Sequence, residues 1–243
     1  MEPKEIQQTL VLIKPDALKL SLTGYVLSQL SEFHTGLRFA ALKVVHVTRM
    51  LAEEHYAEHK GKFFYDSLLE YIMGHIHYPD APHKRRVIAL AYSGPDAVNK
   101  VREISGPTNP HVAREKAPGT IRALGTVVPV KDAAGHVVGE RMDNLVHGSA
   151  TLAEAQREIK LWFKPNDIMP YMRAYPIDIC REQYYVKDGS LLTSPEPGST
   201  NVLSPGDVAW KSDLEALRLI AGGKPAPCSL DAVVAKYLIN REP

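Results

Sequence analysis

Short apolar runs of strand length, each followed by a helical pattern, divide the first 164 residues of the chain. The run TLVLIK at 9–14 ends at Pro15, which is typical of a buried strand closed by a residue that cannot continue it. Further strands are predicted at 37–47 and 87–92, and helices at 22–33, 50–60, 64–73, 96–104 and from Thr151 onward. This order favours an α+β or α/β sandwich, in which helices cover one sheet.

Particular residues mark where these helices begin and end. Thr151 and Glu154 have the spacing of a capping box, in which each side chain satisfies a free backbone N–H. Gly36 follows the first helical pattern as a stop signal. The apolar face of that pattern is formed by Leu22, Val26, Leu27, Leu30 and Phe33.

Turn-rich segments separate the later elements. Residues 105–120 contain three prolines and two glycines, so we expect a long irregular loop there. Residues 126–138 alternate apolar and polar around 132–135, which predicts a hairpin.

The character of the chain changes after Pro165. Asp188–Gly189 lies between QYYV and SLLT and predicts a second hairpin turn. Helix caps are predicted at Ser212, with a glutamate three residues later, and at Ser229. Apolar residues at helical spacing over 230–238 lead us to expect that this extension packs on the core or on a neighbouring subunit.

Charge and cysteine content exclude several classes of protein. With 29 Lys and Arg against 28 Asp and Glu, the composition does not resemble that of a polybasic nucleic-acid or membrane-binding protein, although it is compatible with a local basic cleft. The predicted strands are mostly aliphatic, which disfavours nucleic-acid binding on an open sheet. No apolar run approaches the ~20 residues of a membrane helix. Cys180 and Cys228 form no metal-type pair, so a reduced, cytoplasmic setting is expected.

The sequence NLVHGS at 144–149 is the strongest candidate for chemistry. Its His147 lies at a predicted strand end, just before the capped helix. A neutral imidazole can attack phosphorus near neutral pH, provided that one ring nitrogen is free and the other is held by an acceptor. Glu158 on the following helix is a candidate acceptor. Taken alone, His147 fits an ordinary core or surface histidine better than a nucleophile, because it is one of ten histidines in the chain.

Cations suited to phosphate are present, but common nucleotide motifs are not. Lys14, Arg102 and Arg122 are candidates, because phosphoryl transfer spreads charge over several oxygens. Each of them also fits a solvated surface charge. The chain contains neither a P-loop nor a G-x-G-x-x-G fingerprint. Histidines at 75, 77 and 83 fit a polar loop better than a metal site, since no cysteine accompanies them.

Taken together, these pieces resemble the nucleoside diphosphate kinase family. The pairing of PGTIR with N-x-x-HGS, and KPD near the start, carries the resemblance, which covers most of residues 6–164. The matching segments are TLVLIKPDAL (9–18), EEHYAEHKGKFFYDSLLEYI (53–72), VIALAYSGPDAVNKVREISGPTNP (87–110), APGTIR (117–122) and NLVHGSATLAEAQREIKLWF (144–163).

The resemblance implies a ferredoxin-like fold, with a four-stranded antiparallel sheet covered by helices. It implies a ping-pong reaction in which a nucleoside triphosphate gives its γ-phosphoryl group to a histidine and the phosphohistidine gives it to a nucleoside diphosphate. Mg²⁺ accompanies the nucleotide phosphates, and the family usually forms homo-oligomers.

The resemblance also implies roles for individual positions. His147 matches the phosphorylated nucleophile and Glu158 the acceptor that orients its ring. Tyr56 matches a tyrosine packed near the catalytic lysine and histidine. Phe64 matches the residue that stacks on the base, with Phe63 as the fallback if the register slips by one. The phosphate-contacting positions correspond to Lys14, Arg102, Thr108 and Arg122, and the sugar-binding position to Asn144. A single aromatic platform without groups that read the base edge predicts broad nucleotide use.

Two insertions and a tail depart from the short family pattern. The insertions lie near 73–86 and 124–143, and the tail comprises 165–243. We therefore expect a catalytic domain at 1–164 followed by an extension that packs on the core or a neighbouring subunit. The alternative function is a nucleotide-binding regulatory or scaffold protein with weak transferase activity.

Overall fold

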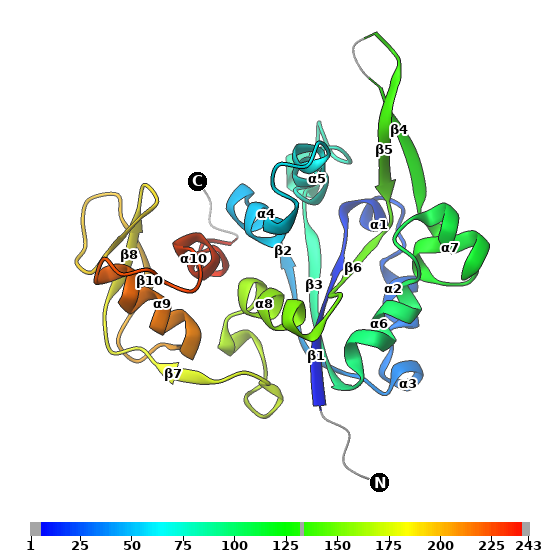
Figure 1. Cartoon of the computed structure of the whole chain (residues 1–243). Helices are drawn as coiled ribbons and strands as arrows, with labels where there is room; N and C mark the ends of the chain where they lie inside the picture. The colour runs from blue at the N-terminus through cyan, green and yellow to red at the C-terminus, as the bar shows by residue number, and fades with distance from the viewer. Residues whose placement is uncertain (1–5, 132–133, 240–243) are drawn as a thin grey trace.

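The sheet predicted from the sequence forms the centre of the molecule. The computed structural model describes residues 6–131 and 134–239. Its four antiparallel strands are β1 (Ile6–Ile13), β2 (Arg38–Val45), β3 (Val87–Pro95) and β6 (Val146–Gly148). They lie in the order β2-β3-β1-β6 (Figure 1). The ferredoxin-like α+β expectation is confirmed.

Helices cover both faces of this sheet. The helices of this part of the chain are α1 (Pro15–Lys19), α2 (Thr23–Gln29), α3 (Glu32–Thr35), α4 (Arg49–His55), α5 (Tyr65–Ile72), α6 (Ala97–Ser105), α7 (Pro110–Lys116) and α8 (Leu152–Trp162). Alternate residues of β1 point to opposite faces, as the pleat requires. Leu12 packs in one cluster with residues of α4, α5 and α8, and Val11 packs in another with residues of α1, α2 and α6.

Short 3-10 helices join several of these elements. They are η1 (Ala57–His59), η2 (Pro82–Lys84), η3 (Ile121–Leu124), η4 (Pro165–Asp167) and η5 (Pro170–Met172). No described helix, in the ranges given above, is both long and apolar enough to cross a bilayer.

Two predictions in the first half of the chain are wrong. The helical pattern at 22–33 breaks into α2 and α3, because Ser31 caps a new helix by accepting the N–H of His34. Phe33 therefore leaves the apolar face and is 94% exposed. The segment 105–120 is not irregular throughout, since Pro110 occupies the first turn of α7, where its missing N–H does no harm.

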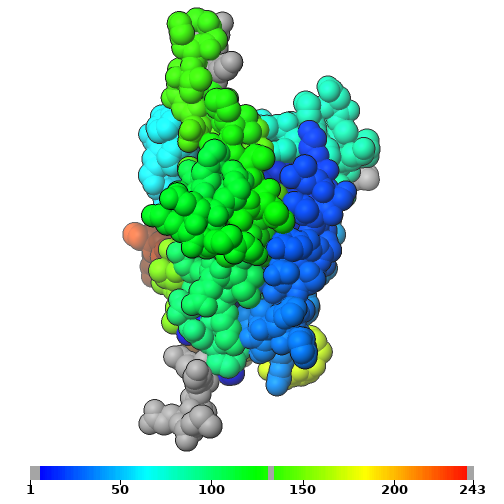
Figure 2. All heavy atoms as spheres, turned by 90° about the vertical axis from the view of Figure 1, so that its right-hand side faces the viewer, coloured from blue at the N-terminus to red at the C-terminus, as the bar shows by residue number. Residues whose placement is uncertain are grey.

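The predicted hairpin at 126–138 is a longer element that projects from the body. Its strands are β4 (Thr126–Lys131) and β5 (Val137–Asp143), which pair antiparallel. Figures 1 and 2 show this hairpin extending beyond the helices around it. Part of the predicted turn, at 132–133, lies outside the described residues.

The chain after α8 forms a smaller group of strands and two helices. These are β7 (Ile177–Ile179), β8 (Tyr184–Lys187), β9 (Ser190–Leu192), β10 (Thr200–Leu203), β11 (Val208–Trp210), α9 (Lys211–Ala221) and α10 (Leu230–Leu238). Asp188 and Gly189 form the β8–β9 turn, both with positive φ. Ser229 caps α10 as predicted, whereas Ser212 lies inside α9, which begins one residue earlier.

Helix α10 packs against α4 and α8 (Figure 1). The Ser229 hydroxyl donates to Glu54 Oε1 at 2.7 Å, and the Trp210 indole N–H donates to the Phe163 carbonyl at 2.8 Å. Lys236 is 2% exposed and donates to Asp213 Oδ2 at 2.9 Å, so a buried ion pair joins α9 to α10.

Candidate active site

A cavity of about 580 Å³ lies where α4–α5, α6, β6 and the β4–β5 hairpin meet. Eight of the nine residues singled out in the sequence line it, and they come from segments far apart in the chain. These are Lys14, Tyr56, Phe64, Arg102, Thr108, Arg122, Asn144 and His147. The ninth, Glu158, touches His147 from α8. Phe63 also lines the cavity, but it is 87% exposed against 36% for Phe64.

His147 is held by a buried carboxylate. Its Nε2–H donates to Glu158 Oε1 at 2.9 Å, and the Ser149 hydroxyl donates to Glu158 Oε2 at 2.6 Å. Burial opposes ionisation of Glu158, but the charge and hydrogen bond of His147 outweigh it and lower its pKa to about 2. An ionised Glu158 keeps the proton on Nε2, which leaves the lone pair of His147 on Nδ1.

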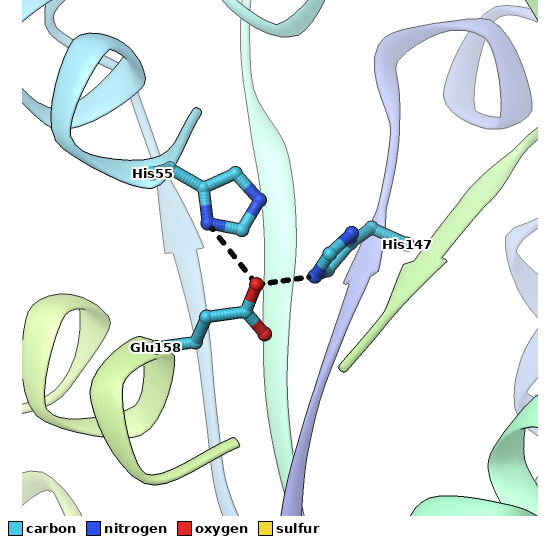
Figure 3. Close-up of side chains that lie close together, drawn as sticks. All are labelled: His55, His147 and Glu158. Atoms are coloured by element: carbon cyan, nitrogen blue, oxygen red, sulfur yellow. Dashed lines mark hydrogen bonds and ion pairs between the residues drawn. The ribbon is translucent and has the colours of Figure 1, made fainter. Parts of the chain in front are cut away.

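A second histidine lies directly behind this pair. The Trp162 indole donates to His55 Nδ1 at 3.2 Å, and the His55 and His147 ring centroids are 4.6 Å apart. Burial, and then repulsion from His147, lowers the pKa of His55 to about 3, so it is neutral. Figure 3 shows both rings converging on the Glu158 carboxylate.

His55 was missed in the sequence, although it directly precedes Tyr56 in the matched segment. His55, His147 and Glu158 have ligand atoms within 4.8 Å of one another, a spacing that would suit a metal ion. The chemistry does not favour one, because the Trp162 N–H occupies the Nδ1 lone pair of His55 and a ring lone pair is what a metal needs. Instead, His147 and Glu158 are joined by a hydrogen bond, and the His55 ring packs edge-on against His147.

The backbone that carries His147 is held in an uncommon conformation. Leu145 has φ +68°, a left-handed geometry that non-glycine residues rarely adopt. The Asp16 carboxylate holds it by accepting the Leu145 N–H at 2.9 Å, and the Lys14 N–H donates to the Leu145 carbonyl at 2.9 Å. The first strand and its following turn thus fix where β6 begins.

Lys14 carries its charge inside the protein. It is 5% exposed, bonds to Asn144 Oδ1 and lies 4.6 Å from the Tyr71 ring centroid. Burial lowers its pKa to about 8, against an opposing attraction to Asp16. The ammonium is therefore still charged at neutral pH but loses its proton more easily than a surface lysine.

Arg122 is fixed by backbone carbonyls at the same end of the cavity. It donates to Gly106 O at 2.9 Å and to Val146 O at 3.2 and 3.3 Å. Burial, and then the charge of Arg102, lowers its pKa to about 10. Gly106 is required here, because its φ is +80° and an added Cβ would lie 2.2 Å from Thr120 Oγ1.

Asn144 connects the cations to the loop before α7. Its amide donates to the Thr108 carbonyl at 2.8 Å while its oxygen faces Lys14. Burial, and then nearby carboxylates, raises the pKa of the Tyr56 hydroxyl, so it stays protonated. Lys14, Arg102 and Arg122 thus line one cavity with a histidine that has a free ring nitrogen, an arrangement suited to a phosphorylated substrate.

The other end of the cavity has more lining residues than the resemblance marked. Phe64 was expected to be a single aromatic platform without groups that read the base edge. The structure adds His59, whose ring lies 5.6 Å from that of Phe64, together with Glu140, Arg141 and Met142 from β5. No sequence signal placed these hairpin residues here, because their contacts are set by how the insertion folds back.

The family model described as nucleoside diphosphate kinase matches residues 7–168. A nucleoside diphosphate kinase of Pyrococcus furiosus is 36% identical over 70% of this chain and 91% of its own, and one of Mycobacterium leprae is 43% identical over 65% and 96%.

Solved structures agree with these relatives. A crystal form of the Aquifex aeolicus nucleoside diphosphate kinase superposes with a TM-score of 0.54 at 30% identity, covering 68% of this chain and all of its own. A transition-state mimic of the Borrelia burgdorferi enzyme with vanadate and ADP gives 0.53 at 30% identity, covering 70% and 94%.

Proposed function

The chain belongs to the nucleoside diphosphate kinase family and acts as a nucleoside diphosphate kinase, and we propose that His147 Nδ1 carries the phosphoryl group between nucleotides. The single observation behind this assignment is the His147–Glu158 hydrogen bond beside a cavity that Lys14, Arg102 and Arg122 also line.

The reaction runs in two steps that share one site. In the first, the Nδ1 lone pair forms a bond to the γ-phosphorus while the bond from that phosphorus to the bridging oxygen breaks, and the nucleoside diphosphate leaves with those electrons. In the second, a terminal oxygen of another nucleoside diphosphate attacks the phosphohistidine, and the electrons of the N–P bond return to Nδ1. Glu158 stabilises the positive charge that the ring gains in between.

The remaining site residues divide by position along the cavity. Lys14, Arg102, Arg122 and Thr108 contact phosphate oxygens, which change little in position between the two steps. Asn144 binds the sugar hydroxyl, Phe64 stacks on the base, and Tyr56 packs beside the reacting groups.

Mg²⁺ enters this scheme with the substrate. It prefers oxygen ligands and usually keeps waters while bridging substrate phosphates. The cavity fits such delivery, because its lining contains the cations of Lys14, Arg102 and Arg122 as well as the carboxylates of Glu58, Glu140 and Glu154. When bound, the ion neutralises part of the phosphate charge.

We also propose a division into a catalytic domain at 1–164 and an extension at 165–243, a cytoplasmic location and a homo-oligomeric assembly. Both cysteines are free, as expected in a reducing compartment. Strand β2 forms one edge of the four-stranded sheet and exposes 54% of the Leu42 side chain, which favours an apolar contact with a second copy. A Leu42→Glu variant that keeps the wild-type mass in size-exclusion chromatography with light scattering would contradict this interface.

Labelling tests the main assignment. The full chain is incubated with Mg²⁺ and ATP radiolabelled at the γ-phosphate, and an acid-labile, base-stable phosphoenzyme is expected. His147→Ala should abolish the label, whereas His34→Ala, an exposed histidine of α3, should retain it. Equal labelling of His147→Ala overturns the assignment. Absence of turnover in a folded wild-type chain would favour the regulatory or scaffold alternative.

A further inference from the structure

We propose that Arg157 is a positioning residue for phosphoryl transfer, because it fastens the C-terminal end of α4 to α8 and so holds the His55 ring against His147. This proposal deepens the proposed function and rests on it. Arg157 directly precedes Glu158 in the chain, but it does not line the cavity. Its effect on the reaction is therefore indirect.

The end of α4 is the part of the structure that Arg157 holds. Helix α4 ends at His55, and the last carbonyls of a helix have no N–H partners within it and carry the negative end of its dipole. Arg157 Nη1 donates to the Glu54 carbonyl at 3.0 Å, and Nη2 donates to the His55 carbonyl at 3.2 Å. A single guanidinium on α8 thus satisfies two carbonyls of a helix that lies far from it in the sequence.

The same guanidinium approaches the carboxylate that orients His147. Arg157 Nη2 lies 3.8 Å from Glu158 Oε1, the oxygen that accepts the His147 Nε2–H at 2.9 Å. A separation of 3.8 Å is too long for a hydrogen bond, and the Arg157 side chain is 42% exposed, so solvent screens this ion pair. The closer contacts of Arg157 are those with the α4 backbone, and they carry its effect.

The His55 side chain has little freedom once its backbone is fixed. The residue is 2% exposed, and its Nδ1 accepts the Trp162 indole N–H at 3.2 Å. Both ends of His55 are therefore held, the carbonyl by Arg157 and the ring by Trp162. Because protein interiors are close-packed, a shift of the α4 end is transmitted to this ring.

His55 in turn limits the tilt of His147. The two ring centroids lie 4.6 Å apart with an interplanar angle of 80°, so His55 presents a wall on the protein side of His147 (Figure 3). The other side of His147 opens to the cavity, and its side chain is 20% exposed. In-line attack requires Nδ1 to point along one direction, and small errors of position cost large factors in rate. A fixed His55 therefore favours the reactive orientation of His147.

The test measures transfer and binding separately on the full chain. Rapid-quench labelling at saturating ATP and Mg²⁺ gives the rate of His147 phosphorylation, and calorimetric titration gives the Kd of ADP. We expect the rate to fall about threefold to tenfold in Arg157→Met while the Kd of ADP stays within about twofold, because Arg157 positions the nucleophile without touching the nucleotide. Arg157→Lys, which keeps the charge but not the fork, should give an intermediate rate.

A matched control and a spectroscopic measurement separate positioning from a general loss of stability. Arg49→Met removes an arginine of α4 that bonds to Glu53 on its own helix at 2.7 Å, and its rate should match wild type. Nuclear magnetic resonance of the chain labelled with ¹⁵N-histidine reports on the His147 ring, whose signals are assigned by their loss in His147→Ala. These signals should broaden in Arg157→Met, because the ring samples more than one orientation, and should stay sharp in Arg49→Met.

A double-mutant cycle tests whether Arg157 acts through His55. His55→Ala removes the ring, so there is nothing left for Arg157 to position. The additional effect of Arg157→Met on the phosphorylation rate should then shrink to within about 1.5-fold. Circular dichroism at the assay temperature shows whether each variant is folded, and the ring signals of His147 in Arg157→Met still test the proposal if His55→Ala does not fold.

Three outcomes overturn the proposal. The first is a phosphorylation rate within about twofold of wild type, with sharp His147 signals, in folded Arg157→Met. The second is a weaker Kd of ADP with an unchanged rate, which would make Arg157 a substrate contact. The third is an undiminished effect of Arg157→Met in folded His55→Ala. Failure of the proposed function is distinguishable, because the wild-type chain would then carry no label on His147, whereas here wild type and Arg157→Met are both labelled there at different rates.

Discussion

Replacing Glu158 by glutamine tests how much the buried carboxylate contributes to phosphoryl transfer. Lowering its pKa from 4.5 to about 2 corresponds to about 3 kcal/mol of net attraction to its surroundings, at about 1.4 kcal/mol per tenfold change in acidity. His147 supplies the largest favourable part of that attraction. Because the imidazole gains positive charge as its nitrogen bonds to phosphorus, the same attraction acts on the transition state.

Losing all of this attraction would slow the reaction about 10²-fold. The loss in Glu158→Gln should be smaller, because glutamine retains an oxygen that can accept the Nε2–H. We therefore expect kcat of Glu158→Gln to fall by about 10- to 100-fold with a small change in KM, measured by rapid-quench phosphorylation at saturating ATP. Glu103→Gln, an exposed glutamate of α6, is the control and should match wild type. A kcat within about twofold of wild type would refute the reasoning.

Other predictions concern pH and stability. Because Lys14 has a pKa of about 8, kcat/KM should fall as the pH rises above about 8, and Lys14→Arg, which keeps its charge, should remove that fall in a pH–rate profile. Gly106→Ala should unfold more easily by at least about 1–3 kcal/mol in urea titrations, because its backbone geometry and the contact with Thr120 both resist a Cβ. Lys236→Met should lower the free energy of unfolding in the same urea titrations by about 3–5 kcal/mol, because it leaves the Asp213 carboxylate buried without its partner. A second change, Asp213→Leu, should restore most of that stability. No recovery in the double variant would contradict the ion-pair account.

The sequence predicted those features that depend on local pattern or on contiguous motifs. The apolar runs predicted the three long strands of the sheet, and Thr151 and Ser229 predicted helix starts that the structure confirms. Phe33 was misassigned, since a helical pattern does not show that Ser31 restarts the helix. Ser212 fits a cap by spacing, but Trp210 already precedes the first turn of α9.

The same distinction separates the site residues that the sequence predicted from those that it did not. His147, Lys14 and Arg122 stand in contiguous motifs, so the resemblance marked them, and the structure places them around one cavity. His55 was not marked, because its importance arises from Trp162 and Glu158, which are about a hundred residues away. Arg141 belongs to an insertion, and its position depends on pairing of β4 with β5.

The hydrogen bond from the Trp162 indole prevents His55, one of two adjacent imidazoles, from acting as a nucleophile. Both rings lie within reach of the same carboxylate, yet the Nδ1 of His55 is occupied by a hydrogen bond and its ring is sealed from solvent. Of these two rings, only His147 offers a competent nitrogen to an electrophile, so the phosphoryl group from one substrate stays on His147 until the next substrate accepts it. Trp162 therefore helps to restrict the phosphoryl group to His147, although it does not line the cavity itself.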